Sequence, residues 1–198
     1  MAEARFRSSR RMALDGVKAM RLSGATSGAV DIRLSAPRAR FSLRLDPSLL
    51  STTKSVAGFT LDMAVNRRTA TGEKAAMRLG PDEWLLSGPE GEAAQIAVDV
   101  GAALAGLHHA LVDVSHHYVA LSVSGPRAAD VINSGCPLDL SPAAFPVGQA
   151  TRTLLGKAQV VLAKTDDLPA FEIACGRSFA AYVHDFLLEA ARELRVRP

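Results

Sequence analysis

Four histidines form the densest group of potentially metal-binding or catalytic side chains in this sequence of 198 residues. They are His108, His109, His116 and His117. Neutral imidazole is a common ligand of transition metals. A strand running straight through Ser115 would place His109, Asp113 and His117 on one face. We expect a turn at Ser115 instead, so the sequence predicts separate surface or subunit-contact histidines and no metal site.

The two cysteines, Cys136 and Cys175, are the next candidates for chemistry, and they lie far apart in the sequence. Cys175 ends a predicted strand just before a helix, a position that stabilises a thiolate. A catalytic thiol also needs a base and an orienting group, and the sequence indicates neither. We therefore predict two small buried thiols, with no disulfide framework and no paired zinc site.

The remaining motifs are incomplete. No Gly-x-Ser-x-Gly elbow occurs, Gly156-Lys157 lacks the preceding glycine of a phosphate loop, and Asp166-Asp167 indicates a turn. No set of residues combines a nucleophile, a base and an oxyanion site. The sequence therefore predicts no catalytic, cofactor-binding or metal-binding residue in this chain.

Alternation of apolar and polar residues predicts most of the strands that would carry these side chains. The predicted strands span residues 30–34, 41–45, 74–79, 83–87, 110–114, 118–124, 151–155, 159–164 and 170–175. Strands joined by two to four residues are expected to pair antiparallel, including 110–114 with 118–124. A short helical turn is expected at 46–50.

Three glycine junctions predict the helices, at Gly88-Pro89, Gly125-Pro126 and Gly176. Proline is tolerated in a first helical turn because its missing N–H would have no partner there. The first helix should run to about Gly106, and the last carries an apolar stripe from Phe179 to Leu194. The expected fold class is α+β, with repeated β-β-α units in which helices cover antiparallel sheet.

Basic charge is concentrated at the start of the chain. The net charge is +3, but residues 1–21 hold six basic and two acidic residues, which leaves a nearly neutral remainder. Residues 1–28 are predicted to be a flexible basic arm, either solvated or partner-bound or else a targeting peptide, and 29–198 a single domain. A neutral body disfavours nucleic-acid binding. No apolar run reaches the roughly 18 residues of a membrane span. A cytoplasmic location is expected.

Several blocks with glycine, proline, aspartate and arginine in fixed order carry a family resemblance. They include residues 79–86, 112–116, 124–131, 135–140, 145–148, 151–157 and 177–180. Through these blocks the chain resembles the gamma subunit of bacterial heterotetrameric sarcosine oxidase. The resemblance covers roughly residues 74–195, is weak over 30–72 and is absent from 1–28.

The resemblance implies a non-catalytic structural subunit with a fold similar to the folate-binding domain of glycine-cleavage aminomethyltransferases. The family's complex oxidatively demethylates sarcosine to glycine, forms hydrogen peroxide and passes the one-carbon unit to tetrahydrofolate or releases it as formaldehyde. It also implies alpha, beta and delta partner subunits that hold FAD, FMN, NAD, zinc and tetrahydrofolate. This chain itself would hold no cofactor.

Two residues in the resembling blocks, Trp84 and Arg127, are candidate anchors of the subunit interface, because few residues usually dominate such contacts. Ordinary internal packing is the alternative for both.

Three alternative functions also remain: the gamma subunit of a related amine oxidase or demethylase, a stand-alone folate-binding protein, and a metal-dependent enzyme using the histidines. Cys136 and Cys175 lack the Lys-Gly-Cys-Tyr-x-Gly-Gln context of the stand-alone group.

Overall fold

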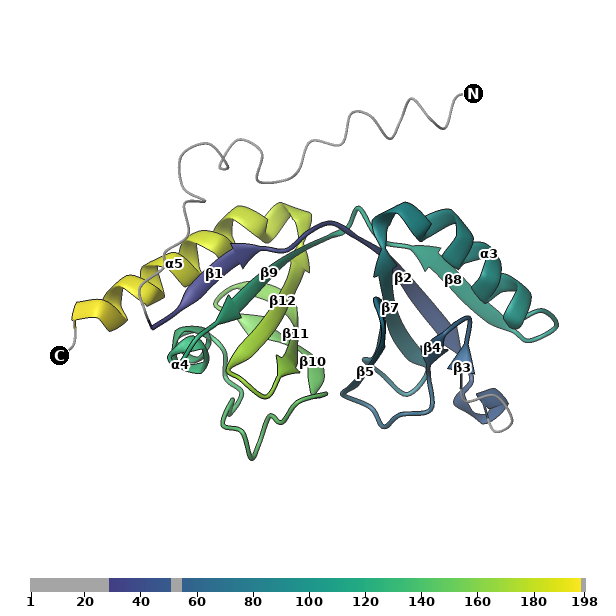
Figure 1. Cartoon of the computed structure of the whole chain (residues 1–198), viewed down its shortest axis with the longest axis horizontal. Helices are drawn as coiled ribbons and strands as arrows, with labels where there is room; N and C mark the ends of the chain where they lie inside the picture. Colours follow the sequence, from purple (N-terminus) through teal and green to yellow (C-terminus); the bar gives the residue numbers. More distant parts are fainter. Residues whose placement is uncertain (1–28, 51–54, 197–198) are drawn as a thin grey trace, which may run out of the picture.

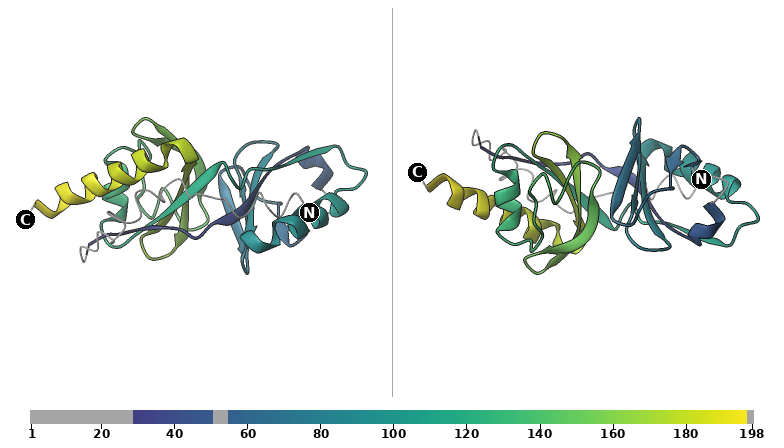
Figure 2. Two further views of the ribbon diagram at one scale, coloured as in Figure 1. Left: turned by 90° about the horizontal axis from the view of Figure 1, so that it is seen from above. Right: turned by 90° about the horizontal axis from the view of Figure 1, so that it is seen from below.

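The computed structural model describes residues 29–50 and 55–196, with side chains described up to residue 193. The predicted basic arm, residues 1–28, lies outside the described residues, so it stays a prediction. The chain forms two five-stranded antiparallel sheets that face each other, with helices on their outer sides (Figure 1). Views from above and below show the two halves side by side along the long axis of the molecule (Figure 2).

The first sheet has the strand order β1-β9-β12-β11-β10. Its strands are β1 (Asp31–Leu34), β9 (Tyr118–Ser124), β12 (Ala170–Gly176), β11 (Ala158–Asp166) and β10 (Ala150–Leu155). The second sheet has the order β5-β6-β7-β2-β8. Its strands are β5 (Arg67–Thr71), β6 (Lys74–Arg78), β7 (Glu83–Pro89), β2 (Arg38–Leu45) and β8 (His109–Asp113).

The chain crosses between the sheets twice, from β1 to β2 through residues 35–37 and from β8 to β9 through residues 114–117. The predicted pairing of β8 with β9 is therefore wrong. β8 pairs with β2, and β9 pairs with β1 and β12. The reason is local: Asp113 accepts hydrogen bonds from the Ser115 N–H and hydroxyl. This turn redirects the chain where a hairpin would fold it back.

All three predicted helices are confirmed. They are α3 (Ala93–Ala103), α4 (Ala128–Asn133) and α5 (Ala180–Val196), and 3-10 turns at Glu90–Glu92 and Arg177–Phe179 precede α3 and α5. The turn predicted at 46–50 is also present, over Pro47–Leu50. Gly88 permits the close approach of the first helix, because a Cβ there would lie 2.5 Å from Ile96 Cδ1.

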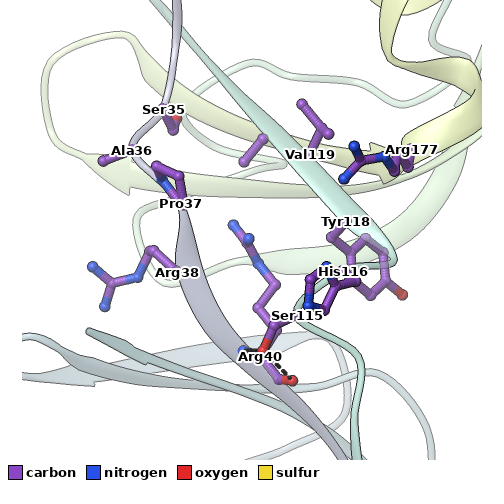
Figure 3. A pocket seen from close by; sticks show the side chains of 11 residues that line it. Ser35, Ala36, Pro37, Arg38, Arg40, Ser115, His116, Tyr118, Val119 and Arg177 are labelled. Carbon is purple, nitrogen blue, oxygen red and sulfur yellow. Dashed lines mark hydrogen bonds between the residues drawn. The ribbon is translucent and has the colours of Figure 1, made fainter. Parts of the chain in front are cut away.

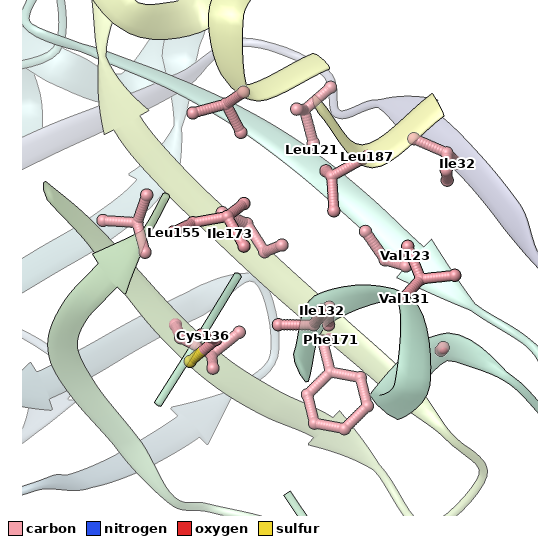
Figure 4. Packing of buried hydrophobic residues seen from close by; sticks show 14 of the residues in the cluster. Ile32, Leu121, Val123, Val131, Ile132, Cys136, Leu155, Phe171, Ile173 and Leu187 are labelled. Carbon is pink, nitrogen blue, oxygen red and sulfur yellow. The ribbon is translucent and has the colours of Figure 1, made fainter. Parts of the chain in front are cut away.

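Each sheet buries large apolar side chains against its own helices. In the first sheet, Leu121, Ile173 and Leu162 lie in a core that includes Val131 of α4 and Leu187 of α5 (Figure 4). The second sheet contributes a separate set. This second core contains Phe41, Leu43, Trp84 and Leu86 of the strands and Ile96 and Val100 of α3. The β-β-α arrangement therefore gives two cores, one on the outer side of each sheet.

The inner faces of the two sheets meet in a third cluster, which we call the seam. It comprises Met77, Leu85, Ala120, Ala150, Val161, Ala163 and Ala174. Two ion pairs also cross it: Arg152 of β10 with Glu83 of β7, and Arg40 of β2 with Glu172 of β12. The inner faces therefore combine four alanines, three larger apolar residues and two ion pairs, whereas the outer faces carry mostly large apolar residues.

Three strands were not predicted from the sequence. β5 and the two-residue strands β3 (Ser55–Val56) and β4 (Phe59–Thr60) lie between residues 55 and 71. β5 has the sequence RRTAT, and none of its residues is buried. An edge strand of this kind carries no apolar alternation, so periodicity gives no signal for it.

Candidate functional site

The four histidines do not come together. His108 and His109 lie at the start of β8, whereas His116 and His117 lie in the turn after its end. The predicted turn at Ser115 is confirmed. His109 Nδ1 lies 2.9 Å from the Leu107 carbonyl oxygen. Within the described part of the chain, no group of three or more His, Cys, Asp or Glu residues could hold a metal ion.

Both cysteines are buried, as predicted, and they are not joined in a disulfide. Cys136 Sγ lies 3.8 Å from the Thr153 hydroxyl. Burial raises the pKa of the Cys175 thiol to about 11. A thiol with this pKa stays protonated at neutral pH, so Cys175 is not an activated nucleophile.

Trp84 has no exposed surface in the folded chain. Its indole N–H donates to the Leu61 carbonyl oxygen at 3.1 Å, and the Arg78 guanidinium lies over its ring. The strand places this residue on the outer face of β7, toward α3. This internal packing favours the packing alternative for Trp84, and its role as an interface anchor stays a prediction.

Arg127 lies at the surface, just before α4, with about half of its side chain exposed. Its guanidinium pairs with Asp130, three residues along the chain. The pair occupies part of its hydrogen-bonding capacity and leaves a charged surface beside the strand–helix junction. Arg127 is therefore placed where a partner can reach it, and its role as an interface anchor stays a prediction.

An aromatic surface at the start of α5 was not identified from the sequence. Phe179 and Tyr182 are 42% and 37% exposed, and their rings lie edge to face. The tyrosine hydroxyl accepts the Lys157 N–H from the β10–β11 hairpin, and Leu154 on β10 is also exposed. Periodicity had assigned Phe179 to the buried stripe. It lies in the 3-10 turn before the helix, where the helical spacing does not apply.

A network of charged side chains connects the two sheets across the seam. Arg152 donates from both terminal nitrogens to Glu83, and Arg44 Nη2 lies 2.9 Å from the same carboxylate. These arginines, with the Arg152 hydrogen bonds first, lower the pKa of Glu83 below its ordinary value of 4.5. Glu83 is 6% exposed, so this network joins the two sheets through a buried carboxylate.

A pocket lies where the two crossing segments meet. Its walls come from residues 35–40 on one side and 115–120 on the other, and Arg177 completes it (Figure 3). The segments are tied together by Arg40 N–H to Ser115 Oγ at 2.9 Å and by Ser35 N–H to Ala120 O at 2.9 Å. Backbone and side-chain hydrogen bonds therefore fix the pocket at the crossover.

Arg40 forms the base of this crossover pocket. Its side chain is 3% exposed, and Glu172 Oε1 is 3.5 Å from its Nη2. Burial, the largest influence, lowers the pKa of Arg40 from its ordinary value. Among the described residues, the half-buried Arg68 also lies near Glu172, and burial lowers its pKa as well. The Glu172 carboxylate therefore lies near two guanidinium groups.

In the described part of the chain, no helix is long and apolar enough to cross a membrane.

A family model described as "Sarcosine oxidase, gamma subunit family" matches residues 43–193. The gamma subunit of sarcosine oxidase from Corynebacterium sp. (strain P-1) is 32% identical over 178 residues, covering 88% of this chain and 86% of the relative. The gamma subunit from an Arthrobacter species is 35% identical over 147 residues, covering 73% and 71%.

Solved structures give the same picture. A chain of the heterotetrameric sarcosine oxidase from Corynebacterium sp. U-96 matches with a TM-score of 0.81 and 27% identity, over 96% of this chain and 98% of that one. Aminomethyltransferase T of the glycine cleavage system from Bartonella henselae matches with a TM-score of 0.63 and 14% identity, over 81% and 46%, which shows a shared fold. The expected aminomethyltransferase-like fold is thus confirmed. The chain belongs to the sarcosine oxidase gamma subunit family.

Proposed function

We propose that this chain is the structural, non-catalytic gamma subunit of a cytoplasmic heterotetrameric sarcosine oxidase. The observation that carries the proposal is the match, over nearly the full length of both chains, to a subunit of such an enzyme. The isolated positions of the histidines and the protonated Cys175 thiol agree with a role in assembly. The chain then contributes contacts, and other subunits contribute the chemistry.

The partners in this proposal are the alpha, beta and delta subunits. The assembled enzyme would oxidise sarcosine to glycine, and FAD, FMN, NAD, zinc and tetrahydrofolate would belong to those partners. The described residues of this chain do not fit zinc, because they supply no group of three ligating side chains. No step of the reaction is therefore assigned to a residue of this chain.

Two parts of the surface support a role in assembly. Arg127 offers a half-exposed guanidinium, and Phe179 and Tyr182 offer exposed rings at the start of α5. Aromatic and arginine side chains are enriched among residues that dominate protein interfaces. We place the partner contacts on these two surfaces, with the aromatic one as the stronger.

Co-expression of the alpha, beta and delta chains with and without this chain tests the proposal. We expect the soluble complex to be lost without it, as measured by size-exclusion chromatography and native mass spectrometry. An intact three-chain complex that lacks only turnover, and regains it when this chain is added, would contradict a structural role.

A matched pair of variants locates the contact. Tyr182→Ala should weaken assembly about thirtyfold, the effect of losing about 2 kcal/mol at an interface anchor. Leu168→Ala removes a side chain that is 72% exposed on the β11–β12 turn, and it serves as the control. Equal assembly of the two variants would exclude the aromatic surface as the contact.

A further inference from the structure

The crossover pocket has the side chains of an anion-binding site. Three arginines and one histidine, Arg38, Arg40, Arg177 and His116, are among its lining residues, and no aspartate or glutamate lines it. Figure 3 shows the Arg40 side chain extending into the space between the two crossing segments, whereas Arg38 points away from it. The positive charge therefore gathers at the base and at one side of the pocket.

The buried guanidinium of Arg40 has hydrogen-bond donors that its partner in the chain does not satisfy. A guanidinium has five N–H donors in a planar fork. Within the described residues, its one charged acceptor is Glu172, at the long distance of 3.5 Å, although the side chain is only 3% exposed. A buried charge with incomplete pairing is costly. An oxyanion in the pocket would pair with the donors that Glu172 does not reach.

The walls of the pocket allow a small group to enter from solvent. Ala36, Pro37, His116 and Arg177 are exposed, whereas Arg40, Ser115, Val119 and Ala120 are buried. The exposed residues thus form a rim, and the buried ones form a floor. The enclosed space of about 30 Å³ is narrow, so it suits a carboxylate group better than a larger anion.

We propose that the crossover pocket binds a carboxylate, with Arg40 as the principal ligand at its base and Arg177 at its rim. Arginine recognises carboxylates through two parallel hydrogen bonds, which matches the planar group to the planar fork. The carboxylate has two possible sources: a free small carboxylic acid, or an acidic side chain of a neighbouring subunit. Binding of a free acid is independent of the structural role proposed above, whereas binding of a partner's acidic side chain rests on that role.

Titration of the purified full chain with acetate, at constant ionic strength against chloride, tests the proposal. Ligand-observed NMR should show saturable binding that Arg40→Met weakens about tenfold or more. Methionine keeps an unbranched stem and removes the charge. Arg192→Gln is the matched control, because Arg192 is 70% exposed on α5 and pairs with Glu189. This control should bind acetate like the parent chain.

Absence of saturable binding, or equal binding by all three proteins, would overturn the proposal, and equal binding would indicate an adventitious ion only. If Arg40→Met does not fold, Arg177→Gln at the rim replaces it, with an expected loss of at least threefold. Repeating the titration on the assembled complex identifies the source. Retained binding indicates a free carboxylate, and binding lost together with weaker assembly of Arg40→Met indicates a partner's acidic side chain.

Discussion

The outer faces of the two sheets and the seam between them come from the same strands but use different side chains. On β11, Val160 and Leu162 point into the helix-covered core, whereas Val161 and Ala163 lie in the seam. Large apolar side chains fill the outer cores, whereas the seam is a smaller apolar cluster rich in alanine and crossed by two ion pairs. Each half thus has its own apolar core, and the two halves meet through a smaller apolar cluster and these ion pairs.

The outer cores should respond most strongly to truncation. Trp84→Ala should lower the free energy of unfolding by about 4 kcal/mol, because it removes the largest fully buried side chain and leaves the Leu61 carbonyl without its donor. Denaturant unfolding followed by circular dichroism measures this loss. A loss below about 1 kcal/mol, together with weaker subunit assembly, would instead show that Trp84 acts mainly as an anchor of the subunit interface.

Neighbouring residues on β11 sample one side chain from each of the two regions. Leu162→Ala should cost about 3 kcal/mol in the outer core. Val161→Ala should cost about 1.5 kcal/mol in the seam, because it removes fewer buried carbons. Both variants are measured by the same denaturant titration, and both side chains are almost fully buried in the parent chain. Equal losses would contradict the larger cost expected at Leu162.

The charged part of the seam should make stability depend on acid pH. Since the folded-state pKa of Glu83 is below 4.5, its contribution is full above about pH 4.5 and is lost as the pH falls through the folded value. Glu83→Gln should cost about 2 kcal/mol at pH 7, because it removes the carboxylate that pairs with Arg152 and leaves Arg44 with Asp82 alone.

Thermal unfolding between pH 3 and 7 measures this contribution, and the parent and variant curves should converge at the acid end. Glu189→Gln, whose ion pair with Arg192 is exposed, is the control and should cost no more than about 0.5 kcal/mol. Parallel curves for parent and Glu83→Gln would show that the seam carboxylate does not contribute to the pH dependence.

The smallest effect is expected at Cys175. With its pKa raised to about 11 and no exposed surface, it should resist a thiol reagent at pH 8 in the native chain. Labelling should become complete when denaturant unfolds the protein, as followed by mass spectrometry. Rapid labelling of Cys175 in the native state would show that the first core opens more readily than its packing indicates.

The outer faces could be predicted from the sequence, and the seam could not. Alternation identified β9 and β12 because large apolar residues recur on one face, and the three glycine junctions identified the helices. The Arg40–Glu172 pair joins residues 132 positions apart, and no local pattern encodes such a contact. The crossing of the chain at Ser115 was also missed, because a four-residue link between two strands favours a hairpin on length alone.

The central claim, that this chain supplies contacts and no chemistry, is tested most directly in the assembled enzyme. The double variant His109→Asn and His117→Asn removes one histidine from each pair, the two that a straight strand would have brought to one face. We predict unchanged turnover of sarcosine per assembled complex and unchanged zinc content. Loss of turnover or of bound zinc in a fully assembled complex would contradict the claim.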